Sequence, residues 1–204
     1  MIAFDFDGVI SDTYNIFRGH FWDVFGFAID KENDHYSFDL GLGRSEYYEE
    51  WWWREIPVAI TKYQHICPPI KESIEAMTAL YNSEHCIADE NILIITAREP
   101  SDAVMQVTKL WCSQNLPFPV DIEFCASSAD KFEVIQRRGV THFIDDRFKT
   151  AQVLSPVLEH SYLLNSPWNT GRVEPLNYNV RRVDTIWGMK LHMDALNAYT
   201  FGGM

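Results

Sequence analysis

The chain has 204 residues and a net charge of -12, with 47% hydrophobic and 14% aromatic residues. A chain of this length buries one sizeable core and a smaller insert, so we expect one domain with a cap. The acidic balance excludes a general duplex-binding protein, because affinity for a nucleic-acid backbone depends on clustered lysine and arginine. A small phosphorylated ligand stays open, since a few local cations and a metal ion can outweigh the overall field.

Cysteine usage and hydropathy predict a reduced, cytoplasmic protein. The four cysteines show no Cys-x-x-Cys spacing, and the N-terminus enters an apolar strand pattern without a signal peptide. No apolar run approaches the roughly 20 residues that span a bilayer, so we expect no membrane partner. The histidines lack zinc-site spacing. No segment has the periodicity of an assembly helix, and a homodimer stays open.

The first twelve residues predict a buried strand that delivers two acids to its carboxyl end, where open α/β sheets place their chemistry. Asp5 and Asp7 project to one side of an extended backbone, and Phe4 and Phe6 project to the other. Gly8 then lets the chain turn away. Two carboxylates in a low-dielectric pocket suit one nucleophile and one proton carrier, because their pKa values move apart. Alone, Asp-x-Asp-Gly also fits a simple acidic turn.

Residues 13–67 interrupt the sheet pattern and predict a small helical cap, which holds about half of the aromatic residues of the chain. Apolar residues recur at helical spacing after Tyr14, and a second helix is expected over 45–56. Pro57 and the prolines at 68 and 69 mark the return to the core. Three consecutive tryptophans begin at Trp51, and they cannot all face inward because successive helical residues differ by about 100°.

Beyond the cap, strands and helices alternate, which predicts right-handed crossovers and a doubly wound parallel sheet. Residues 1–12 and 68–204 form this α/β core. The expected strands are 92–96, 120–124, 140–144 and 162–164, the last parallel strand, and the expected helices are 70–81, 103–111, 132–138, 151–154 and 186–199.

Three later stretches, like the first twelve residues, place polar side chains at a strand end or at a helix start. An apolar run ends in Thr96 and is followed by a small residue and a cation, Lys131 begins a helix, and a short strand closes on Asp145 and Asp146. In chain order these stretches supply a phosphate-binding hydroxyl, a phosphate-binding ammonium and metal carboxylates. This order, with each part at a strand end or a helix start, resembles the haloacid dehalogenase-like (HAD) phosphotransferase superfamily.

The resemblance implies a hydrolase that uses Mg²⁺ and a covalent phosphoenzyme. Asp5 attacks phosphorus, and Asp7 protonates the leaving alkoxide and then activates water. Mg²⁺ is expected on Asp5, the backbone carbonyl of Asp7 and Asp145, because it prefers hard oxygen ligands.

The remaining predicted site residues bind phosphate or support the metal ligands. Thr96, the amide of Ala97 and Lys131 hold the phosphoryl oxygens as charge redistributes. Asp146 is expected behind the ligands, where it orients Lys131 or a water of the metal.

Within the superfamily, the chain resembles the 5'(3')-deoxyribonucleotidase family. The resembling stretches are 5–9, 37–40, 96–98, 111–118, the helix at Lys131, 143–147 and 163–169, where Pro-Trp-Asn follows the last expected strand. This resemblance implies removal of phosphate from nucleoside monophosphates, with cap aromatics around the base. The candidate substrate-binding residues are Phe17, Phe38, Trp51, Trp52 and Arg98.

Two other interpretations stay open at this point. The substrate could be another small phosphoester, such as a sugar phosphate or a polynucleotide 3' end. The chain could also be a catalytically silent binding protein, because fold does not fix function. Retention of a nucleophile and of metal ligands speaks against the silent protein.

Overall fold

The computed structural model describes residues 1–26, 46–86, 92–170 and 175–201. Its six-stranded sheet is parallel throughout, in the order β3-β2-β1-β4-β5-β6. The strands are β1 (Ile2–Phe4), β2 (Ile92–Thr96), β3 (Val120–Phe124), β4 (His142–Asp145), β5 (His160–Leu164) and β6 (Val180–Val183). The predicted doubly wound sheet is confirmed. Its order reverses between β1 and β4, so the crevice at their carboxyl ends is the place where such folds bind ligands.

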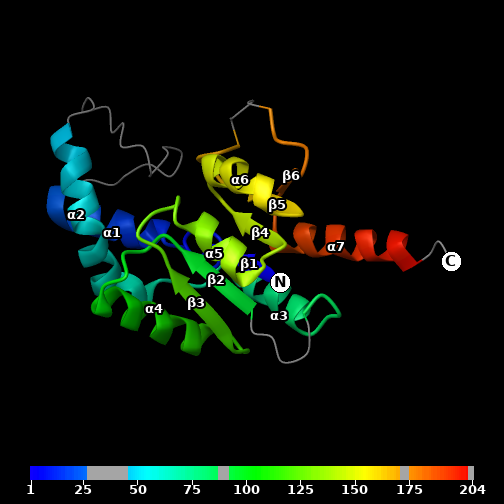
Figure 1. Ribbon diagram of the computed structural model, residues 1–204. Coiled ribbons are helices and arrows are strands. Elements are labelled where there is room, and N and C mark those ends of the chain that lie inside the picture. Colours follow the sequence, from blue (N-terminus) through cyan, green and yellow to red (C-terminus); the bar gives the residue numbers. More distant parts are fainter. Residues whose placement is uncertain (27–45, 87–91, 171–174, 202–204) are drawn as a thin grey trace.

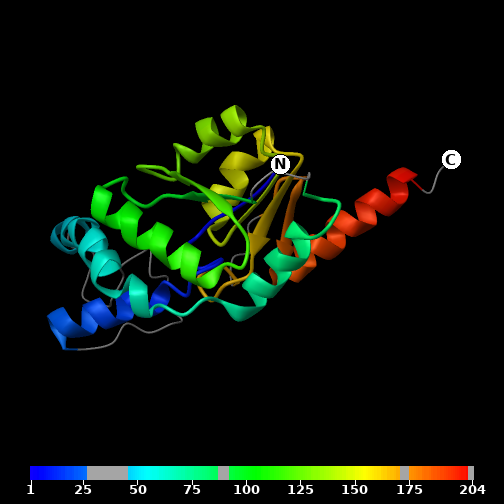
Figure 2. The same cartoon turned by 90° about the horizontal axis from the view of Figure 1, so that it is seen from below.

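Helices cover both faces of the sheet (Figures 1 and 2). One face carries α3 (Lys71–Tyr81), α4 (Asp102–Asn115) and α7 (Ile186–Phe201), and the other carries α5 (Lys131–Arg138) and α6 (Phe148–Leu154). Alternation along β1 decides which core each residue joins. Phe4 belongs to the cluster with Met77 and Met189, while Ala3 belongs to the cluster with Ile135.

The cap contributes two helices, α1 (Tyr14–Phe25) and α2 (Glu46–Tyr63), which ends in the 3-10 turn η1 (Gln64–Ile66). They lie together beyond one end of the core (Figures 1 and 2). Two adjacent connections join cap to core, because Ser11 and Pro69 form an antiparallel bridge. The intervening residues 27–45 belong to the predicted cap and lie outside the described residues, as does Phe38.

Two of the expected boundaries are wrong. The segment 162–164 is not the last parallel strand, because β6 pairs with β5 at the edge of the sheet. The helix expected to end at residue 56 continues through Pro57 to Tyr63. Proline removes one helical hydrogen bond, but Ala59 and Ile60 are buried in the small cap cluster, and this packing carries the helix onward.

The cysteines and the hydropathy of the helices are both seen in the described ranges. All four cysteines are free thiols, and three of them are buried. Over the described part of the chain, the helices are too short or too polar to cross a bilayer.

Candidate active site

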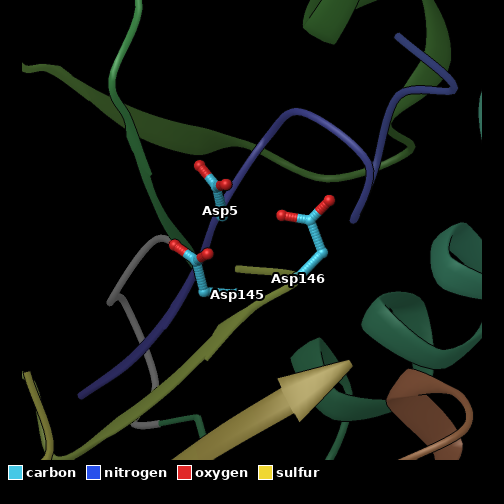
Figure 3. A group of neighbouring side chains, drawn as sticks. All are labelled: Asp5, Asp145 and Asp146. Carbon is cyan, nitrogen blue, oxygen red and sulfur yellow. The ribbon is translucent and has the colours of Figure 1, made fainter. Parts of the chain in front are cut away.

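Three acids meet where β1 and β4 end. Asp5 follows β1, Asp145 closes β4, and Asp146 comes next in the chain (Figure 3). Because β1 and β4 are parallel neighbours, their carboxyl ends lie together, and one oxygen of each acid lies within 4.8 Å of the others. All three side chains are buried. Chain segments about 140 residues apart are thus brought to one point of the sheet edge.

Lys131 joins two of these acids from the first turn of α5. Its Nζ lies 2.8 Å from Asp5 Oδ1 and 2.8 Å from Asp145 Oδ2, and its side chain is only 1% exposed. Burial disfavours the ammonium, but the two carboxylates outweigh this effect and raise the pKa of Lys131 above its usual range. The lysine is therefore a fixed positive charge beside the predicted nucleophile.

Asp145 and Asp146 have different surroundings although they are neighbours in sequence. Asp145 accepts hydrogen bonds at both oxygens, from Lys131 and from the backbone amide of Arg147 at 2.8 Å. Both oxygens of Asp146 are buried without a hydrogen-bond partner among the described residues. Asp145 is thus satisfied by the protein, whereas Asp146 is left to interact with something else.

The electrostatics of this cluster fit a divalent cation. Burial, together with nearby Asp145 and Asp5, raises the pKa of Asp146 well above its ordinary value. Burial also raises the pKa of Asp5 to about 7, against the effect of Lys131. A cation between such groups removes the cost of burying like charges. Hard carboxylate oxygens without protein partners are a donor set that suits Mg²⁺.

The loop after β1 approaches Asp146 so closely that only glycine fits. Gly8 has φ +73°, and a Cβ there would lie 2.2 Å from Asp146 Oδ2 and 3.2 Å from Trp168 Cζ2. On the other side, buried Asn169 donates from Nδ2 to the carbonyl oxygens of Asp146 (2.6 Å) and Leu164 (2.8 Å). The Pro-Trp-Asn stretch that the sequence singled out therefore supports the acidic cluster.

Asp7 is surrounded by donors. Thr13 donates to its Oδ1 at 2.7 Å, Thr96 to its Oδ2 at 3.3 Å, and Arg98 contacts both oxygens at 2.7–3.1 Å. Burial works against the ionised form, but the guanidinium and these hydrogen bonds outweigh it and hold the pKa of Asp7 below its ordinary value. Sequence reasoning missed Thr13, although its place just after the acidic loop was a usable signal.

A cavity of about 160 Å³ opens beside Asp5, Asp7 and Lys131. Of the three residues predicted to bind phosphate, Ala97 and Lys131 line it, whereas Thr96 is fully buried and turns its hydroxyl to Asp7. The cap contributes an apolar wall and the core adds polar groups; the further lining residues are Phe17, Ile56, Ile60, Arg98, Ala126, Ser127, Ser128 and Arg147. Ser127 and Ser128 were missed, although they follow β3 at the same sheet edge.

The predicted substrate-binding residues fall into different places. Phe17 lines the cavity from α1, and Arg98 is buried against Asp7. Trp51 and Trp52 lie in α2, but their side chains, like Phe38, lie outside what the structure describes.

Comparison with known proteins identifies the fold. No protein-family model and no curated protein matches the sequence. A hydrolase from Pseudomonas syringae superposes with a TM-score of 0.58 at 12% identity, covering 96% of this chain and 98% of that one. A candidate phosphoglycolate phosphatase from Lactobacillus plantarum gives 0.57 at 10% identity, with 96% and 97% covered. A HAD-superfamily hydrolase of subfamily IA from Geobacter sulfurreducens gives 0.53 at 12% identity, with 94% and 97% covered. The chain therefore has the α/β fold of HAD-superfamily hydrolases.

Proposed function

We propose that the protein is a Mg²⁺-dependent phosphomonoester hydrolase that works through an aspartyl-phosphate intermediate. The observation that carries the proposal is the arrangement around Asp5, beside a cavity: the buried Lys131 contacts it, and close by is the carboxylate of Asp146, which has no hydrogen-bond partner among the described residues. A carboxylate nucleophile that approaches a phosphate dianion needs positive charge nearby. Lys131 supplies one such charge, and a cation bound to Asp146 would supply another.

In the first half-reaction, an oxygen of Asp5 attacks phosphorus and the ester P–O bond breaks. Asp7 gives a proton to the leaving alkoxide, and the negative charge of the bound phosphate favours the protonated form of its carboxyl against the effect of Arg98. Lys131 and the amide of Ala97 hold phosphoryl oxygens. In the second half-reaction, water attacks the phosphorus of the aspartyl phosphate, Asp7 takes its proton, and inorganic phosphate leaves Asp5 as a carboxylate.

Asp5, Asp146 and the backbone carbonyl of Asp7 are the groups that we assign to Mg²⁺, which supplies charge that cancels repulsion between nucleophile and phosphate. This assignment reverses the roles that the sequence suggested for the two adjacent acids. Asp145 is a candidate ligand by position, but its oxygens already hold Lys131 and the amide of Arg147. Its role in the proposal is to keep Lys131 charged and in place.

For the substrate we propose a nucleoside monophosphate, with deoxyribonucleotides preferred. The support is the resemblance of several sequence stretches to the 5'(3')-deoxyribonucleotidase family, together with the ring of Phe17 in the apolar wall that α1 and α2 present to the cavity. Such a wall suits the planar face of a base. The core side of the cavity, where Ser127, Ser128 and Arg147 lie with Lys131, offers polar groups that also suit a smaller organic phosphate, which is our second candidate.

Phosphate release from a panel of ribo- and deoxyribonucleoside 5'- and 3'-monophosphates and simple sugar phosphates tests the proposal, with Mg²⁺ or EDTA. We expect turnover that disappears with EDTA and falls by at least ~10⁴-fold in Asp5→Asn, because the nucleophile is lost. Selective turnover of deoxynucleotides supports the nucleotidase, and preference for sugar phosphates supports the second candidate. An Asp5→Asn variant as active as wild type contradicts the mechanism.

A further inference from the structure

Arg98 holds the carboxylate of Asp7 through two nitrogens. Nε lies 3.1 Å and 3.0 Å from the two oxygens, and Nη2 lies 2.7 Å from Oδ1. The arginine follows β2, and its side chain is 2% exposed. A planar guanidinium that meets a carboxylate through two nitrogens fixes the direction of the carboxylate plane as well as its position.

The other donors of Arg98 are bound to protein as well. Nη2 donates to Gln64 Oε1 at 2.7 Å, and Nη1 donates to Thr108 Oγ1 at 2.8 Å. The ring of Phe6 lies 4.4 Å from the guanidinium carbon. These contacts occupy nearly all of the N–H groups of Arg98. The arginine therefore has few donors left with which to bind a phosphate.

The contact with Gln64 connects this network to the cap. Gln64 lies in η1, is fully buried, and donates from Nε2 to Ser11 Oγ at 3.2 Å. Ser11 lies in the outgoing connection between core and cap, and η1 leads into the returning one. Arg98 therefore fixes the position of Asp7 relative to both connections between core and cap. Through Thr108 it also fixes Asp7 relative to α4.

We propose that Arg98 is a positioning residue: it acts through Asp7 by fixing its carboxylate beside Asp5, and it does not bind substrate. The inference rests on the proposed function for its consequence in catalysis. Misplacement of a proton-transfer group by about 1 Å costs on the order of 10²-fold in rate. A lysine at position 98 offers one point charge without the fixed fork, so it cannot hold both the carboxylate and Gln64 in the same geometry.

The test compares Arg98→Lys in the wild-type and Asp7→Asn backgrounds, with Arg138→Lys as the matched control. Arg138 makes ion pairs with Asp121 and Glu123 outside the cavity. We expect Arg98→Lys to lower kcat by about 10²-fold with KM within about 3-fold. In the Asp7→Asn background the same substitution should cost less than about 3-fold, since its effect passes through Asp7. Arg138→Lys should leave kcat unchanged.

Other outcomes overturn the proposal. Equal losses in both backgrounds mean that Arg98 acts independently of Asp7, and a raised KM with unchanged kcat makes it a substrate-binding residue. If Arg98→Lys fails to fold, Gln64→Met keeps the arginine and removes one of its anchors. That variant should lose about 5-fold in kcat at constant KM, and no loss contradicts the proposal.

Crystal structures of wild type and of a folded variant separate this inference from the proposed function. The Asp7 carboxylate should keep its position in wild type and change its rotamer in Arg98→Lys, or in Gln64→Met if the former does not fold. An unmoved Asp7 overturns the positioning role even if the protein hydrolyses phosphoesters. Wild type that releases no phosphate from any substrate overturns the proposed function, while the crystallographic comparison still decides the positioning role.

Discussion

Asp145 and Asp146 show how much chemistry depends on orientation at a single residue. Both carboxylates reach the acidic cluster (Figure 3), but Asp145 meets Lys131, whereas Asp146 has no hydrogen-bond partner among the described residues. The sequence predicted the acidic pair at the end of an apolar strand and the lysine at the start of a helix, and the structure has them there. It could not assign roles within the pair, since the deciding contacts come from α5 and from the loop after β1.

Gly8 should be essential for the acidic cluster. Alanine there needs φ +73° and places Cβ 2.2 Å from Asp146 Oδ2. We expect Gly8→Ala to lower the free energy of unfolding by about 3 kcal/mol, from the backbone penalty and overpacking together. Turnover should be lost as well, because Asp146 must move.

Gly139 provides the matched control. It has φ +63°, but an added Cβ there meets nothing within 4 Å. Gly139→Ala should cost only about 1 kcal/mol in urea unfolding, the backbone penalty alone, and should keep its turnover. Equal losses of stability in the two variants would show that close approach to Asp146 is unimportant.

At the scale of elements, apolar runs predicted most of the sheet because its central strands are buried on both faces. Strand β6 was missed for the opposite reason: its four residues include Arg181 and Arg182, and only Val180 and Val183 are buried. An edge strand of this kind has too few apolar positions to show a period. Helix α2 extends past Pro57 because Ala59 and Ile60 are buried, and this tertiary packing outweighs the local preference of proline to end a helix.

Three histidines at the opposite end of the sheet join β4, β5 and α7. The rings of His142 and His160 lie 5.2 Å apart, and those of His160 and His192 lie 5.1 Å apart. The hydroxyl of Tyr162 lies 3.0 Å from His192 Nδ1. Burial lowers the pKa of His142 to about 4, helped by His160, the N-terminal ammonium, His85 and His192. Burial also lowers the pKa of His160 and of His192.

This cluster should make the fold sensitive to acid. The unfolded chain binds protons at histidine near pH 6.5, while folded His142 resists them until about pH 4. Stability is therefore complete above pH 6.5 and falls as the pH drops toward 4. After allowance for solvent screening, we expect His142 to account for on the order of 1–2 kcal/mol of that loss.

Urea unfolding between pH 4 and pH 7 measures this effect. His142→Gln should have a shallower pH dependence than wild type, because it removes the group that titrates only on unfolding. The exposed His65 in η1 is the control, and His65→Gln should follow the wild-type curve. The cluster has no such role if His142→Gln also keeps the full slope.

At the scale of the whole molecule, the strand and helix patterns correctly predicted the doubly wound parallel core around the helical segment that contains α1 and α2. They could not predict how the segment is held. Arg98, Gln64 and Ser11 form a buried hydrogen-bonded chain across the two connections, and each is an ordinary polar residue in the sequence. Buried networks of this kind depend on residues far apart in the chain, so neither spacing nor hydropathy marks them.

Mg²⁺ should stabilise the entire fold, because its proposed ligands come from the two strands, β1 and β4, between which the order of the sheet reverses. Asp5 follows β1 and Asp146 follows β4, so an ion bound to both opposes global unfolding. With Mg²⁺ at about 100 times its dissociation constant, the expected gain is about 2.7 kcal/mol, or roughly 5–10 °C in Tm.

Substitution of the two neighbouring acids decides which one holds the ion. Without metal, Asp146→Asn should be more stable than wild type by about 1 kcal/mol, because it removes a buried carboxylate that forms no hydrogen bond within the described part of the chain. It should gain little Tm on addition of Mg²⁺. Asp145→Asn should lose about 3 kcal/mol without metal, because Lys131 keeps only one of its two carboxylates, and should still respond to Mg²⁺. The opposite pattern in thermal unfolding would return the ligand role to Asp145, since only the acid that holds the ion links metal binding to the stability of the whole chain.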